Sequence, residues 1–236
     1  MIYPDDSQRI TIVGRTGTGK TVAALHQLSV RSYTEIPWYI IDFKTDVWIN
    51  RIPYAVDVDL DADIVDQPGI YRVHPIPEED DKSVASLMRR IWQRQNCGVF
   101  IDEAAMIPRT NTAYNALLTQ GRSRRCPVIT VTQRPVGISK WAFTEMDFFQ
   151  VFRLLSEQDI DKCEEYLPRG VDLGENSLPK YYSYYYDVSA GRLSVLKPAP
   201  KPEEILEHFD DRLKPQVQMH DEVSPLVRRT KILRKI

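Results

Sequence analysis

The sequence predicts an α/β fold in which a mainly parallel sheet is covered by helices on both faces. Short β-rich runs alternate with helix-periodic runs over residues 9–166. The predicted strands are apolar on both faces, which is typical of parallel strands that lie between two layers of helices. The composition agrees, because 42% hydrophobic and 27% charged residues are ordinary values for a globular chain of 236 residues.

Strands and helices are predicted to alternate from the N-terminus. Continuous β-branched and aromatic runs predict strands, and apolar residues spaced three or four apart predict helices. The predicted strands are residues 9–13, 38–42, 70–73, 98–101, 128–132 and 148–155. The predicted helices are residues 19–31, 82–95, 112–124 and 157–166.

The C-terminal part follows a different pattern. Residues 181–187 and 192–196 predict a β-hairpin with Gly191 in its turn. The run K-P-A-P-K-P that follows predicts a stiff extended linker, then a short helix over residues 203–212 and a basic tail. We therefore expect one domain over residues 1–197 and a linker with a tail over residues 198–236.

The charge pattern is uneven along the chain. The formal net charge is −2, which argues against a protein that coats nucleic acid over its whole surface. Acidic residues gather in residues 56–66 and 78–81, where we expect a solvent-facing edge strand or insertion. A local basic site remains compatible with this balance. The widely spaced Cys97, Cys126 and Cys163 are expected to be buried reduced thiols.

Residues 14–21 read G-R-T-G-T-G-K-T and fit the phosphate-loop pattern G-x-x-x-x-G-K-[ST] in full. The segment follows a predicted strand and opens a predicted helix, so its backbone N–H groups would surround phosphate oxygens. Lys20 would reach the β- and γ-phosphates, and the Thr21 hydroxyl would ligate Mg²⁺. The predicted nucleotide-binding residues are Gly14, Arg15, Thr16, Gly17, Thr18, Gly19, Lys20 and Thr21.

A second motif, G-V-F-I-D-E at residues 98–103, is an apolar strand that ends in two acids. Asp102 would meet the Mg²⁺ held by Thr21, and Glu103 would polarise the attacking water. An apolar run followed by D-E is common by itself, so this prediction depends on its pairing with the phosphate loop.

Polar and basic residues flank the predicted strand 128–132. The strand ends in T-Q-R-P, where Gln133 would sense the γ-phosphate or hold the water; a polar turn before Pro135 is the alternative. Three arginines precede the strand, and complementing a helix C-terminus accounts for at least one of them. Arg122 is the first candidate, and Arg125 the second, for an arginine that one subunit supplies to the site of its neighbour.

The order of these motifs, with a strand ending D-F-K at residues 42–44, resembles that of the FtsK/HerA family of DNA-pumping ATPases. The compact size is more similar to that of the genome-packaging ATPases of tailless, internal-membrane double-stranded DNA viruses than to that of bacterial FtsK. The resemblance covers residues 10–167, and T-Q-R-P with its upstream arginine is the more specific part. It implies a RecA-like (ASCE) P-loop NTPase fold that hydrolyses ATP with Mg²⁺, in a hexameric ring around double-stranded DNA. By the same resemblance, the family's roles would fall to Lys20, Thr21, Asp102, Glu103, Gln133 and Arg122.

The sequence indicates the DNA contacts less clearly than it indicates the nucleotide-binding residues. A ring motor needs only a few basic loop residues to hold the duplex backbone. The candidates are Lys44, Arg51, Arg134 and Lys140, for each of which an ordinary surface position is the alternative. The tyrosine-rich run 181–186 predicts a strand packed at a subunit interface, with base stacking as the alternative. For the basic tail from residue 223, DNA, a membrane surface, a capsid protein and no partner all stay open.

The sequence therefore predicts an ATP-driven translocase of double-stranded DNA that packages a viral genome, with capsid vertex or portal proteins as further partners. The alternatives are a conjugative or filamentous-phage DNA export ATPase, and a nucleotide-switched assembly factor that moves no DNA. Neither a transmembrane segment nor a signal peptide is expected. The expected location is the cytoplasm, that of the host for a viral protein, or a packaging vertex of the virion.

Overall fold

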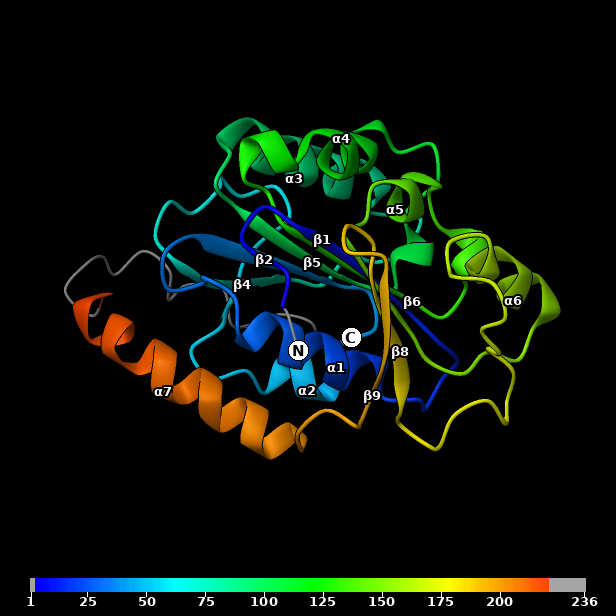
Figure 1. Ribbon diagram of the computed structural model, residues 1–236. Helices are drawn as coiled ribbons and strands as arrows, with labels where there is room; N and C mark the ends of the chain where they lie inside the picture. Colours follow the sequence, from blue (N-terminus) through cyan, green and yellow to red (C-terminus); the bar gives the residue numbers. More distant parts are fainter. Residues whose placement is uncertain (1–2, 221–236) are drawn as a thin grey trace, which may run out of the picture.

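The computed structural model describes residues 3–220 and is built around one nine-stranded sheet (Figure 1). The strand order is β3-β4-β2-β5-β6-β1-β7-β8-β9. Neighbouring strands from β3 to β7 are parallel, and β8 and β9 continue the sheet antiparallel. The strands are Arg9–Val13 (β1), Pro37–Asp42 (β2), Val56–Asp57 (β3), Gly69–Val73 (β4), Gly98–Asp102 (β5), Val128–Thr132 (β6), Phe148–Val151 (β7), Ser183–Asp187 (β8) and Arg192–Leu196 (β9). The predicted α/β class is confirmed.

Helices cover both faces of the sheet. The α-helices are Lys20–Ser29 (α1), Val47–Asn50 (α2), Asp81–Arg94 (α3), Thr112–Gln120 (α4), Trp141–Thr144 (α5), Glu157–Glu164 (α6) and Pro202–His220 (α7). Figure 1 shows α3, α4 and α5 over one face and α1, α2 and α7 over the other. Short 3₁₀ turns lie at Ala104–Met106, Arg122–Arg124 and Pro135–Gly137.

Alternate residues of each central strand enter two separate cores. Tyr39 and Ile41 pack with α3 and α4, whereas Trp38 and Ile40 pack with α1 and α7. This arrangement explains why the central strands are apolar without alternation, since both faces of the sheet exclude water.

Two predicted elements end earlier than expected, and one acidic segment is mostly not a strand. Helix α4 stops at Gln120, and the arginine-rich segment after it forms a 3₁₀ turn. Strand β7 ends at Val151 rather than residue 155. Of the acidic residues 56–66 only β3 pairs with the sheet, and Arg90 and Arg94 of α3 bind the remainder through backbone carbonyls and Asp66.

Helix α7 corrects the expected C-terminal organisation. The predicted 203–212 helix is part of a 19-residue helix. Its Ile205, Phe209 and Leu213 are at most 3% exposed, and the Phe209 ring lies 5.3 Å from that of Tyr33. This apolar face completes the core beside α1. Helix α7 therefore packs on the domain, and a linker with a tail that begins at residue 198 does not include it. The basic tail from residue 223 lies outside the described residues.

The tyrosine-rich run contributes mainly to the core of its own chain. Tyr185 is 5% exposed and stacks on Phe148 with 5.4 Å between ring centroids. Tyr184 and Tyr186 pack from the opposite face of β8. The aromatic residues therefore occupy both faces, as predicted, but they face neighbouring elements of the same chain. Tyr181, which precedes β8, is 43% exposed.

Candidate nucleotide-binding site

The phosphate loop joins β1 to α1 at the carboxyl edge of the sheet. Gly17 and Gly19 adopt left-handed backbone conformations, with φ of 77° and 94°, that favour glycine. Inside the loop the Lys20 ammonium donates to the Arg15 carbonyl at 2.7 Å, and the Thr18 hydroxyl donates to the same oxygen at 2.8 Å. Burial, together with the Lys44 ammonium, lowers the pKa of Lys20 to about 8. The loop therefore has the curled form in which backbone N–H groups can face an anion.

Asp102 ends β5 as a buried carboxylate. Its side chain is 1% exposed, and neither oxygen has a hydrogen-bond partner within residues 3–220. Burial raises the pKa of Asp102 to about 7, against the opposing effect of Lys44. A buried carboxylate with free oxygens fits a cation, so the Asp102 side chain is suited to a Mg²⁺ ion. The described part of the chain contains no cluster of three or more acidic, His or Cys side chains that could hold a metal ion.

Replacing Asp102 by Asn is expected to stabilise the metal-free protein at high pH. The pKa of Asp102 rises from 3.8 to about 7 on folding, so its contribution to stability is complete below pH 4 and is lost as the pH rises through 7. This difference corresponds to roughly 4 kcal/mol at most. We expect Asp102→Asn to raise the Tm at pH 8 by about 5–10 °C, with little change at pH 4.

Calorimetric unfolding of both proteins at the two pH values checks this. The variant is also expected to lose the stabilisation that Mg²⁺ and ATP give the wild type. A Tm that falls at pH 8 would show that the Asp102 charge is compensated within the protein.

Glu103 lies at the centre of the site and joins three predicted motifs. Its side chain is 3% exposed, and its backbone is left-handed with φ of 62°, a strained conformation for this residue type. Oε1 accepts from the Thr132 hydroxyl and the Gln133 N–H, both at 3.0 Å. The Gln133 side chain in turn accepts from the Thr16 hydroxyl at 2.6 Å. The strand order explains this meeting, because β6 lies between β1 and β5.

Lys44 occupies a different place from the one predicted. Its ammonium forms an ion pair with Oε2 of Glu103 instead of standing free for DNA. The buried Asp42 carboxylate holds this loop by accepting from the N–H groups of Lys44 and Asp46, at 3.1 and 2.9 Å. Asp42 also lies opposite Asp102 in the β2–β5 register, and burial raises its pKa. Asp42 is a site residue that the sequence motifs did not single out, although an apolar strand ending in an acid is the same signal that identifies Asp102.

The two candidate arginines lie near the amino ends of the parallel strands, whereas the phosphate loop lies at their carboxyl ends. Arg122 and Arg125 are exposed, and Arg122 is 3.8 Å from Asp147 at the amino end of β7. Arg124 instead lies over the Trp92 ring at 3.5 Å from its centroid, so it is the structural member of the three. Five strand residues separate the amino ends from the phosphate loop, a distance of about 16 Å. Arg122 therefore does not reach the site of its own chain.

The other DNA candidates differ in how free their charges are. Arg134 follows Gln133 and is 61% exposed, with its Nε 3.3 Å from Asp159. Lys140 is exposed beside the Trp141 ring. Arg51 lines a hollow of about 390 Å³ whose other wall is the acidic face of α7, so its charge is poorly placed for a polyanion. The acidic residues of that wall are Glu203, Glu207, Asp210 and Asp211.

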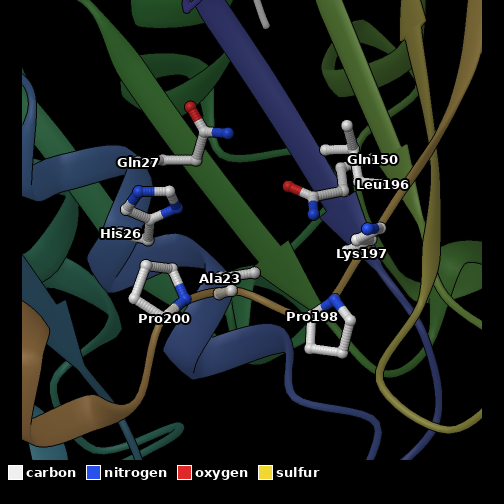
Figure 2. A pocket seen from close by; sticks show the side chains of 9 residues that line it. Ala23, His26, Gln27, Gln150, Leu196, Lys197, Pro198 and Pro200 are labelled. Atoms are coloured by element: carbon white, nitrogen blue, oxygen red, sulfur yellow. The ribbon is translucent and has the colours of Figure 1, made fainter.

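A separate cavity of about 210 Å³ lies between α1 and the segment that follows β9 (Figure 2). The side chains of Gln27 and Gln150 line it, and each leaves a buried amide oxygen without a partner in the described chain. Its lining contains no carboxylate and no phosphate-loop residue. This cavity is polar enough for water but is not part of the nucleotide site.

The comparisons with known proteins identify the family. No model of a known protein family matches the chain. Over 216 residues the chain is 40% identical to DNA packaging ATPase P9 of Enterobacteria phage PRD1. The aligned region covers 88% of this chain and 94% of the phage protein. The chain belongs to the family of this viral DNA-packaging ATPase.

Solved structures show how widely the fold of this packaging-ATPase family extends. The genome packaging NTPase B204 of Sulfolobus turreted icosahedral virus 2, in complex with AMPPCP, matches with a TM-score of 0.66 and 18% identity over 83% of this chain and all of B204. EssC ATPases 2 and 3 of Geobacillus thermodenitrificans match with a TM-score of 0.61 and 12% identity, over 92% of this chain and 45% of that one. At these identities the likeness shows the P-loop ATPase fold alone. Within residues 3–220, no helix has the length and apolar character needed to cross a membrane.

Proposed function

We propose that the chain is an ATP-driven motor that moves double-stranded DNA into a viral capsid. The observation that carries this proposal is the 40% identity to a viral DNA packaging ATPase over nearly the whole of both chains. The phosphate loop and the buried Asp102 and Glu103 support it, because together they supply the parts that ATP hydrolysis needs.

In this proposal each site residue has one task. The backbone of residues 14–21 and the Lys20 ammonium bind the triphosphate, and Thr21 and Asp102 hold Mg²⁺. The metal supplies neutralisation of the charge that develops on the phosphates. Glu103 accepts a proton from the attacking water, and Gln133 reports loss of the γ-phosphate because it connects Thr16 with Glu103.

The position of Arg122 supports a ring of subunits, which we propose to be a hexamer. An exposed arginine that cannot reach its own site is suited to complete the site of a neighbour, where it would stabilise transition-state charge. Arg125 is the second candidate for the same task. Heterologous contacts of this kind repeat around a closed ring.

The DNA contacts are assigned to Arg134 and Lys140. Arg134 directly follows Gln133, so a change at the γ-phosphate would reach it through one peptide bond. Contacts of a few cations with the phosphate backbone need no base recognition. The remaining partners in this proposal are capsid vertex or portal proteins, and the place of action is the host cytoplasm and the packaging vertex.

Movement along duplex DNA tests the proposal. ATP should drive release of a third strand annealed to a duplex, because a translocating ring cannot pass it. Without such release, an assembly factor that hydrolyses ATP but moves no DNA would be the better description. Release with no effect on capsid filling would favour a DNA export motor.

A further inference from the structure

The strand order fixes the direction in which a bound nucleotide must lie. Asp102, Glu103 and Gln133 all follow strands on the β6 side of the phosphate loop, so the γ-phosphate faces that side. The opposite neighbour of β1 is β7, followed by β8. The nucleoside end of the triphosphate therefore leaves the loop on the side of β7 and β8.

Chain segments from that side already border the phosphate loop. The Arg15 N–H donates to the Arg153 carbonyl at 3.2 Å, and the Arg15 guanidinium pairs with Glu175. Tyr181 lies at the end of this segment, just before β8. A Cβ built on Gly19 would lie 3.3 Å from Cδ1 of the Tyr181 ring, so the ring stands directly beside the loop.

Three features of Tyr181 suit a ring that contacts a ligand, although Tyr54, far from the phosphate loop, shares its exposure and its left-handed backbone. Its side chain is 43% exposed although it is a large aromatic group. Its backbone is left-handed with φ of 68°, a conformation that costs free energy in a residue with a Cβ and that is concentrated at functional sites. The Lys180 ammonium lies 4.8 Å from the ring centroid, which places a cation at the same point.

We propose that Tyr181 binds the base of the nucleotide by stacking on it, next to the phosphate loop. This inference deepens the proposed function, since it rests on the phosphate loop holding a nucleoside triphosphate. A flat aromatic ring offers a base contact that depends little on base identity, because every base has a π-face. Glycine at position 19 keeps this contact close, because its left-handed backbone favours glycine and a Cβ there would make the ring move by a few tenths of an ångström.

Binding of a non-hydrolysable ATP analogue and of inorganic tripolyphosphate, each with Mg²⁺, tests this by titration calorimetry. Tyr181→Ala is expected to weaken binding of the ATP analogue about tenfold, the typical loss of one stacking contact. Tripolyphosphate has no base, so its affinity should not change. Tyr181→Phe retains the ring and should bind both ligands as the wild type does.

Tyr54→Ala is the matched control, because Tyr54 is 40% exposed and left-handed with φ of 59° but lies beside β3, at the far edge of the sheet. It should leave both affinities unchanged. An equal loss for tripolyphosphate in Tyr181→Ala would overturn the proposal, since the ring would then only support the loop. Unchanged affinity for the ATP analogue would overturn it as well. The assay contains no DNA, so its outcome is independent of whether the protein is a DNA motor.

Discussion

Replacing Glu103 by Gln is expected to lower kcat for ATP hydrolysis by about 10²–10⁴, the range for loss of a general base. Glutamine has the same shape, so its amide oxygen can still accept from Thr132 and from the Gln133 N–H. The substitution removes the ability to take a proton from water, together with the ion pair between Glu103 and Lys44. ATP binding, measured by calorimetry, should stay near that of the wild type.

Glu165→Gln is the control for this substitution. Its carboxylate also pairs with a lysine, Lys162 at 2.7 Å, but it is 56% exposed at the C-terminal end of α6. It should leave kcat unchanged. Retained hydrolysis in Glu103→Gln would show that another group activates the water.

Replacing Arg122 by Ala is expected to lower the ATPase rate by about 10³ or more if this arginine stabilises transition-state charge. The side chain is 64% exposed and its ion pair with Asp147 is long at 3.8 Å, so folding stability should change little. Thermal unfolding of the variant separates a catalytic loss from a structural one.

Mixing two inactive variants tests whether Arg122 acts between subunits. Lys20→Ala removes the phosphate-binding ammonium but keeps Arg122, whereas Arg122→Ala keeps an intact phosphate loop. In mixed rings roughly a quarter of the interfaces would combine an intact loop with an intact neighbouring arginine, and activity should return in that proportion. Two variants that stay inactive when mixed, each with an undisturbed oligomeric mass, would contradict the assignment of Arg122.

The sequence was sufficient for the central fold because its signals are local. Each buried strand is a continuous apolar run, and the phosphate loop has a fixed spacing of glycine, lysine and threonine. Position in a parallel sheet then brought Asp102, Glu103 and Gln133 to one edge, as predicted from strand ends alone. These features do not depend on details of side-chain packing.

The parts that the sequence did not predict depend on long-range contacts. No local pattern shows that Lys44 pairs with Glu103, because the two residues meet only after β2 and β5 align. The proline-rich run before α7 indicates a linker, but the burial of Phe209 against Tyr33 is a contact across 176 residues that only the folded chain defines. The sequence pattern predicts Tyr181 as part of a strand, whereas it lies in a turn beside the phosphate loop.

Third-strand release tests whether ATP hydrolysis at this site moves duplex DNA. A duplex carrying an annealed third strand is incubated with the protein and ATP, and free third strand is followed over time. We expect release with ATP by the wild type, and none by Glu103→Gln or with a non-hydrolysable analogue. A wild-type protein that binds the duplex and hydrolyses ATP, yet releases no more third strand than in the absence of ATP, would contradict this expectation.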